Sequence, residues 1–142
     1  MNVVLKRVGD EISPDDGARV LVERHRPAEL TDEKLQLAAW FPLLAPSAEL
    51  LRWFGAMQRR WPLFRRRYLA ELSEPAREEP LIWLHQLAAN EQRVTLLTDA
   101  ADPERSHAAI LRDLIQGVRK PPATSGPVRA ASGRMQARKP RP

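Results

Sequence analysis

The spacing of apolar residues along the chain predicts three strands. Residues 3–8, 19–24 and 93–98 are short runs rich in valine and leucine, a composition typical of strands. After Arg93, the third run is a continuous series of β-branched residues and leucines, as in a strand buried in a parallel sheet. The segment that joins the first two runs contains proline, aspartate and glycine, and we expect it to form a loop.

Apolar residues with helical spacing fill most of the chain between the second and third runs. Thr31 is the N-cap candidate of a short helix that we expect Pro42 to end or kink. Ser47 is the N-cap candidate of a second helix, which Gly55 would close, and Pro62 suits the first turn of a third. The third helix has an apolar stripe with a four-residue repeat, formed by Phe64, Tyr68 and Leu72.

Two more helices are predicted around the third strand. Pro75 and Pro80 precede the first of them, whose apolar face comprises Leu84, Leu87 and Ala88. Asp102 as N-cap and Pro103 as the first helical residue begin the second. Its apolar face is formed by His107, Leu111, Leu114, Ile115 and Val118.

The order strand, strand, helices, strand, helix predicts an α/β fold, with a small, mainly parallel sheet in a three-layer arrangement flanked by helices. Four tryptophans fall in the predicted helical segments: Trp40, Trp53, Trp61 and Trp83. We expect them to pack in the core and between helices, and not to stack on nucleic-acid bases.

The net charge of +5 comes from the C-terminal end of the chain. Residues 1–119 contain 17 basic and 18 acidic side chains, whereas residues 120–142 contain six basic side chains and no acidic one. This last segment is also rich in Pro, Gly, Ser and Ala, which predicts a disordered tail after a domain of residues 1–119. The tail is interpreted either as a solvating segment or as a weak, salt-sensitive contact to nucleic acid.

A run of three arginines, Arg65 to Arg67, lies mostly off the apolar stripe of its helix. We interpret it as a solvated face that carries nearby glutamates, and the alternative is an anion-binding patch.

Several classes of site are excluded or disfavoured by composition. The chain has no cysteine, which excludes disulfides, a thiol nucleophile and cysteine-ligated metals, and three histidines argue against a histidine-rich metal site. We therefore expect no metal and no cofactor. No apolar run approaches the roughly 18 residues that cross a bilayer, and the first residues lack the pattern of a signal peptide. The expectation is a cytoplasmic protein without membrane contact.

In open α/β sheets, ligands bind beyond the carboxyl ends of the strands. The second strand ends in Glu23, Arg24, His25 and Arg26, the third in Thr98 and Asp99, and His107 lies early in the last helix. We predict an anion-binding crevice there, with His107 as hydrogen-bond donor or proton carrier. Its candidate anion-binding residues are Arg24, Arg26, Lys6 and Arg19. The alternative is that Arg24 pairs with Glu23, Glu29 or Asp99, and that His107 is a hydrogen-bonded core residue.

Four blocks, in order along the chain, resemble the domain-of-unknown-function 488 family, YeaO-like group. They read KRV…DDGARVLVERHRPAEL, LAPSAELLRWF, FRRRYLAEL and VTLLTDAADPERSHAAIL, and span about residues 4–114. The resemblance implies an α/β fold and no established activity.

The chain departs from the family's usual motifs at the two strand ends and at the start of the last helix. Arg26, Ala28, Thr98 and Ala101 stand where the family typically has tryptophan, arginine, tyrosine and lysine. Asp99, Arg105 and Ser106 are further departures, whereas the packing positions follow the family. The resemblance therefore implies a retained scaffold with a degenerate site.

Three functions are compatible with these observations. The leading prediction is a non-catalytic or weakly binding module for a small anion or nucleotide. The first alternative is an enzyme acting on a phosphorylated or nucleotide-like substrate, with His107 as general acid/base. The second is an accessory protein whose basic tail binds nucleic acid.

Overall fold

The computed structural model describes residues 2–26, 28–56 and 59–117, which form an α/β fold. All of its strand pairs are parallel, in one sheet of order β1-β4-β2-β3. The strands are β1 (Val3–Arg7), β2 (Ala18–Leu21), β3 (Ala39–Trp40) and β4 (Val94–Thr98). The predicted α/β class is therefore confirmed. The predicted boundary after residue 119 and the tail lie outside the described residues.

Strand β4 lies at the centre of the sheet, between β1 and β2. Val94 is paired with Val3 of β1 on one side and with Ala18 of β2 on the other, and all five residues of β4 are buried. The run of β-branched residues and leucines at residues 93–98 thus predicted both the strand and its burial correctly.

The entry to β2 depends on Gly17. Its φ of 68° lies in the left-handed region, and a Cβ there would come within 2.1 Å of the Arg93 carbonyl oxygen. Only glycine fits, because the backbones of the two segments approach too closely for a side chain. The close approach allows the Ala18 N–H to bond the Arg93 oxygen at 2.9 Å.

The helix predicted between Thr31 and Pro42 is mostly wrong. Thr31 does cap a helix, α1 (Asp32–Leu35), but Gln36 adopts a left-handed φ of 52° and ends it. The chain then forms the edge strand β3, in which Trp40 pairs with Leu21. The open edge of β2 offers backbone hydrogen bonds, and this tertiary pairing overrides the helix propensity of the segment's leucine, glutamine and alanine residues. The placement of Trp40 in a helix is therefore wrong too.

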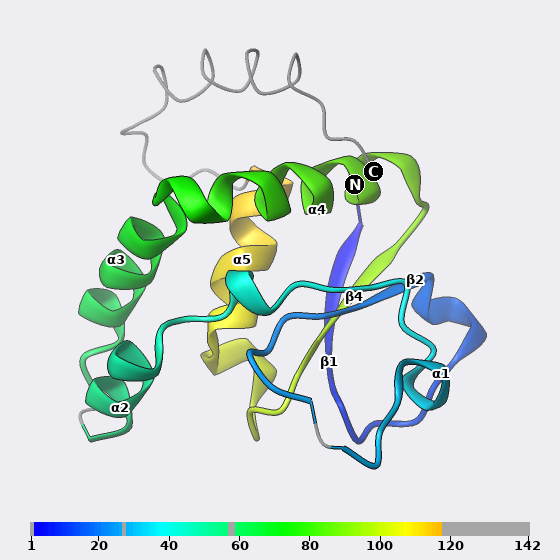
Figure 1. Ribbon diagram of the computed structural model, residues 1–142, viewed down its shortest axis with the longest axis horizontal. Helices are drawn as coiled ribbons and strands as arrows, with labels where there is room; N and C mark the ends of the chain where they lie inside the picture. Colours follow the sequence, from blue (N-terminus) through cyan, green and yellow to red (C-terminus); the bar gives the residue numbers. More distant parts are fainter. Residues whose placement is uncertain (1, 27, 57–58, 118–142) are drawn as a thin grey trace.

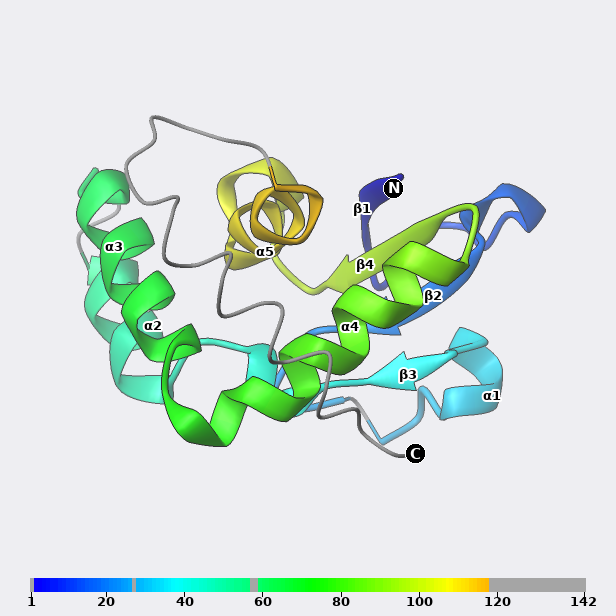
Figure 2. The ribbon, with the colours of Figure 1, turned by 90° about the horizontal axis from the view of Figure 1, so that it is seen from above.

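Four longer helices complete the fold: α2 (Ala48–Ala56), α3 (Trp61–Leu72), α4 (Glu78–Asn90) and α5 (His107–Gln116). Figures 1 and 2 show α5 between the sheet and the α2–α3 pair, with α1 beside β3 at the opposite end of the molecule. The predicted stripe of α3 is buried in the core: Phe64, Tyr68 and Leu72. No helix in the described ranges is long and apolar enough to cross a membrane.

The last helix begins later than predicted. Asp102 caps a short 3-10 turn, Pro103–Arg105, and Ser106 is the N-cap of α5, with its hydroxyl accepting from the Ala108 N–H. Leu114 was predicted on the buried face, but its side chain is 44% exposed. Helical spacing cannot show that the first turns of α5 are enclosed on nearly all sides while its last turns are not. Val118 lies outside the described residues.

Candidate functional site

A crevice of about 430 Å³ lies at the carboxyl edge of the sheet. It is formed by the residues that follow β2 and β4, by the first turn of α5 and by side chains of α2 and α3. The lining residues are Glu23, Leu51, Phe54, Trp61, Phe64, Thr98, Asp99, Ala100, Ala101, Asp102, Arg105, Ser106 and His107. The structure therefore places a cavity where the strand ends meet the start of α5.

Glu23 occupies the polar end of this crevice. It is two residues beyond β2, and its Oε2 accepts hydrogen bonds from Thr98 Oγ1 at 2.5 Å and from the Asp99 N–H at 3.1 Å. Thr98 Oγ1 in turn accepts from the Ala100 N–H. Burial raises the pKa of the Glu23 carboxyl above its ordinary value, against the opposing effects of His107 and of the hydrogen bond from Thr98.

His107 is 4% exposed and lies next to Glu23. Its Nε2 is 2.8 Å from the Val22 carbonyl oxygen and 3.7 Å from Glu23 Oε2. Because a carbonyl oxygen only accepts, the Nε2–H donates this bond, which selects the protonation state of that nitrogen. The Tyr68 ring packs edge-on against the imidazole, with 5.8 Å between ring centroids. These contacts are those of a hydrogen-bonded core histidine.

The apolar wall of the crevice is aromatic. Phe54 of α2 stacks on Phe64 of α3 with 4.3 Å between ring centroids, and Trp61 stacks on the same Phe64 at 5.4 Å. Phe64 is fully buried, whereas Phe54 and Trp61 are half-buried at the crevice. The wall therefore offers flat apolar surface to a ligand.

The charged lining residues are mainly acidic. Glu23, Asp99 and Asp102 contribute carboxyl groups, and Arg105 contributes a guanidinium. Asp99, Asp102 and Arg105 are exposed at the mouth, while Glu23 is buried. The crevice thus combines one cation with several acceptors of hydrogen bonds.

Arg24 and Arg26 do not line the crevice. An NH2 nitrogen of Arg24 donates to the Pro46 carbonyl oxygen at 3.1 Å. Arg26 pairs with Asp32, and its guanidinium lies 5.1 Å from the centroid of the Trp40 ring. Arg26 is thus directed to α1 and β3, whereas Arg24 is directed to the loop that precedes α2.

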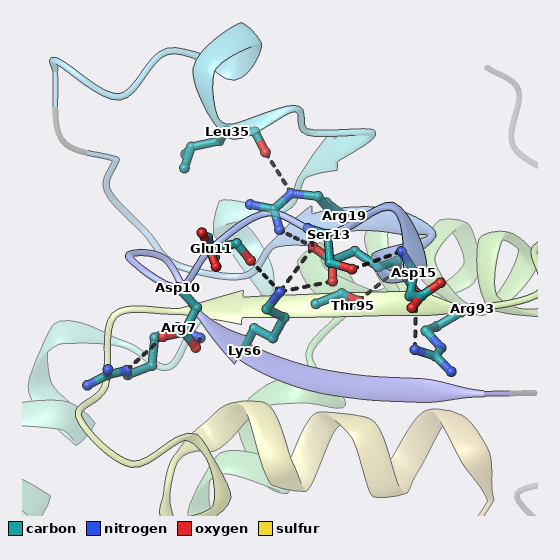
Figure 3. Close-up of polar contacts among 11 residues, drawn as sticks. Lys6, Arg7, Asp10, Glu11, Ser13, Asp15, Arg19, Leu35, Arg93 and Thr95 are labelled. Atoms are coloured by element: carbon teal, nitrogen blue, oxygen red, sulfur yellow. Dashed lines mark hydrogen bonds and ion pairs between the residues drawn. The ribbon is translucent and has the colours of Figure 1, made fainter.

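Lys6 and Arg19 form a separate cluster around Asp16 (Figure 3). Asp16 accepts from Lys6 Nζ at 3.0 Å and from Arg19 Nη1 at 2.6 Å. Arg19, which is 3% exposed, also donates from Nε to the Leu35 carbonyl oxygen. Burial raises the pKa of Asp16, but the Ser13 N–H, Lys6 and Arg19 together bring it below the ordinary value. The structure therefore does not bring the four predicted anion-binding residues together, and their role stays a prediction.

Sequence reasoning did not single out Arg105 or the aromatic wall. Arg105 was noted only as a departure from a family motif, Trp61 was expected only to pack in the core and between helices, and Phe54 was not singled out. No local pattern indicates that α2 and α3 extend to the carboxyl edge, because that depends on how the helices pack. Among the described residues, no group of three or more possible ligands lies so as to hold a metal ion.

Residues 2–128 match the model of a family described as "Inactive DUF488-N3 subclade". The chain belongs to this subclade. It is 36% identical over 115 residues to the uncharacterised protein Rv3073c of Mycobacterium tuberculosis, covering 81% of this chain and 94% of the relative. It is 34% identical over 120 residues to the uncharacterised protein YeaO of Escherichia coli K12, covering 83% and 100%. No solved structure matches.

The family membership allows the residues that line the crevice to be compared with the family's usual motifs. The lining includes five of the departures from the family's usual motifs: Thr98, Asp99, Ala101, Arg105 and Ser106. Two further departures that the resemblance implies, Arg26 and Ala28, lie outside this lining.

Proposed function

We propose that the protein is a non-catalytic binding module whose crevice takes a small ligand with a planar ring and one anionic group, such as a nucleoside monophosphate. The observation that carries the proposal is the bond from His107 Nε2–H to the buried Val22 carbonyl. This hydrogen bond uses the imidazole nitrogen that lies next to Glu23. Glu23 Oε2 in turn accepts hydrogen bonds from Thr98 Oγ1 and from the Asp99 N–H. The best acid and base candidates are thus used to hold β2, β4 and α5 together.

The chemistry of the lining supports this ligand class. Half-buried Trp61 and Phe54 suit a planar base, and the carboxylates of Glu23 and Asp99 can accept from amino groups on such a ring. Arg105 is the cation available for a phosphate. One guanidinium beside several carboxyl groups favours a single phosphate over a triphosphate, because additional negative charge would be repelled.

Calorimetric titration of the full chain with adenosine, adenosine monophosphate and inorganic phosphate tests the proposal. Arg105→Gln is expected to weaken monophosphate binding by about tenfold, the scale of one charge-assisted hydrogen bond, and to leave adenosine binding unchanged. Arg93→Gln, which removes a cation outside the crevice, is the matched control and is expected to bind like the unchanged protein. Equal losses in both variants, or no binding of any nucleoside compound at millimolar concentration, would contradict the proposal.

The enzymatic alternative is tested in the same samples. If His107 acts as general acid/base on a nucleotide-like substrate, chromatography will show conversion of the compound, and His107→Asn will abolish it. Conversion of this kind would replace the non-catalytic proposal. The subclade's description as inactive supports the non-catalytic form.

A further inference from the structure

The α2–α3 pair concentrates positive charge to a degree that no other part of the domain does. Residues 48–72, which comprise the two helices and the segment between them, contain six arginines and two glutamates, whereas the rest of residues 1–119 contain 11 basic and 16 acidic side chains. The six are Arg52, Arg59, Arg60, Arg65, Arg66 and Arg67. A nearly neutral domain therefore has a cationic end and an acidic remainder.

These arginines are available to a partner. None of the ion pairs between described residues includes any of them. Arg65 is half-buried and the other five are exposed. The glutamates that were expected to neutralise the triple arginine do not do so, since Glu71 binds Ser47 and Glu74 pairs with Arg77. Six unneutralised cations close together repel one another unless an anionic partner is present.

The position of the pair in the fold leaves this surface open. In both ribbon views α2 and α3 lie on the far side of α5 from the sheet (Figures 1 and 2). Phe64, Tyr68 and Leu72 fill the inner side of α3, so its arginines lie on the remaining sides. The Arg67 guanidinium lies 4.6 Å from the centroid of the half-buried Trp53 ring, which adds a flat aromatic surface beside the charges.

A partner that binds all of these arginines needs several negative charges, spaced along its length. The basic tail of this chain is excluded because it carries no acidic residue. A lipid surface is disfavoured because, among the described residues of the two helices, Leu51 alone is an exposed large apolar side chain, too little apolar surface to insert. A nucleic acid fits, since a duplex carries one negative charge per roughly 1.7 Å of its axis and engages several arginines at once. Arginine and tryptophan also stack on bases.

We propose that the α2–α3 pair binds the phosphate backbone of a nucleic acid without sequence preference. This surface is distinct from the ligand crevice and from the tail, and the proposal does not depend on either.

The test is fluorescence anisotropy of labelled single-stranded RNA and double-stranded DNA, titrated with the full chain at 50–200 mM KCl, a salt range over which phosphate contacts are strongly weakened, roughly 10³-fold or more for six of them. The variant replaces four exposed arginines by glutamine: Arg52→Gln, Arg59→Gln, Arg60→Gln and Arg66→Gln. The matched control removes four charges from the tail: Arg129→Gln, Arg134→Gln, Arg138→Gln and Arg141→Gln. A third variant replaces the same four helix-pair arginines by lysine.

The helix-pair variant is expected to bind at least about tenfold more weakly. Its salt slope is expected to be smaller by roughly three to four, because each lost phosphate contact removes about 0.9 from the slope on duplex DNA and about 0.7 on a single strand. The tail variant is expected to lose less, and the lysine variant to keep most of the binding, since ammonium groups also bind phosphate. The proposal is overturned if the tail variant loses as much or more, if lysine does not restore binding, or if phosphatidylserine vesicles bind more tightly than either nucleic acid. The relative affinities for single-stranded RNA and double-stranded DNA show which kind of nucleic acid the surface prefers.

Discussion

Two polar clusters on the same parallel sheet differ in how completely their charges are neutralised. Around Asp16, two cations converge on one buried carboxylate and also donate to backbone carbonyl oxygens. Around Glu23, a buried carboxylate accepts from Thr98 and from a backbone N–H, and the cavity beside it stays open. The first cluster contains more of the predicted anion-binding residues, but the second has the space for a ligand.

The comparison teaches that basic residues in a sequence indicate an anion site only when no carboxylate reaches them first. Asp16 is three residues before Arg19 and pairs with it across the entry to β2. Arg105 has no such partner among the described ion pairs and lies at the mouth of the crevice. Charge pairing in the folded chain thus separates cations that stabilise the fold from the cation offered to a ligand.

The largest expected effect on stability comes from removing Asp16, the carboxylate that Lys6 and Arg19 share. Asp16→Ala leaves Lys6 and the buried Arg19 without their carboxylate, and we expect a loss of about 3–5 kcal/mol in the free energy of unfolding, as for other broken buried pairs. Urea denaturation measures it. Asp10→Ala, which removes the partner of the more exposed Arg7, is the control, with an expected loss below about 1 kcal/mol. Similar losses in the two variants would show that the closed cluster is not a stabilising centre.

A smaller loss of stability is expected when the cluster around Glu23 and His107, beside the crevice, is changed. His107→Phe keeps an aromatic ring beside Tyr68 but removes the donor to the buried Val22 carbonyl, which is expected to lower the free energy of unfolding by about 1–3 kcal/mol. His25→Phe, at an exposed position after β2, serves as the control and is expected to change stability by less than about 0.5 kcal/mol. If His107→Phe is equally mild, the imidazole is free for chemistry and the non-catalytic proposal loses its main support.

The pH dependence of stability distinguishes the two carboxylates. Because burial raises the pKa of Glu23, the unfolded chain releases this proton at lower pH than the folded one, and stability falls as pH rises from the ordinary pKa to the raised one. Asp16 contributes in the opposite sense, since its pKa is lowered and its stabilisation is lost as pH falls. Glu23→Gln is expected to make the fall with rising pH shallower, as measured by thermal melts across the acidic range. The exposed Glu29→Gln is expected to leave the profile unchanged, and identical profiles for both variants would contradict the assignment.

The smallest effect is expected from Arg26. Its ion pair with the exposed Asp32 and its stacking on Trp40 together stabilise the fold by about 0.5–1 kcal/mol. Arg26→Gln is expected to reduce stability by that amount and to leave monophosphate affinity unchanged, because Arg26 does not line the crevice. A loss of monophosphate affinity equal to that of Arg105→Gln would show that Arg26 takes part in anion binding. It would contradict the separation of cations that stabilise the fold from the cation that binds a ligand.

Much of the fold could be predicted from the sequence because its elements have strong local patterns. The apolar run of β4, the four-residue repeat in α3 and the N-cap at Thr31 all occur where they were expected. The rule that ligands bind beyond strand ends also located the crevice near Thr98 and His107. The failures share a different property: the edge strand β3 and the exposure of Leu114 depend on what packs beside them.

The sequence by itself determined the class of fold and the edge of the sheet at which a cavity forms, because spacing and turn chemistry act over a few residues. The family came from the resemblance of four sequence blocks to known motifs. Only the tertiary structure decided which charges are neutralised and which are offered to a partner. Thr98 and Glu23 are 75 residues apart in the chain and bond across adjacent strands. Arg105 meets Trp61 at the crevice only because α3 packs on α5. Contacts of that kind depend on the approach of distant segments, which no local pattern encodes.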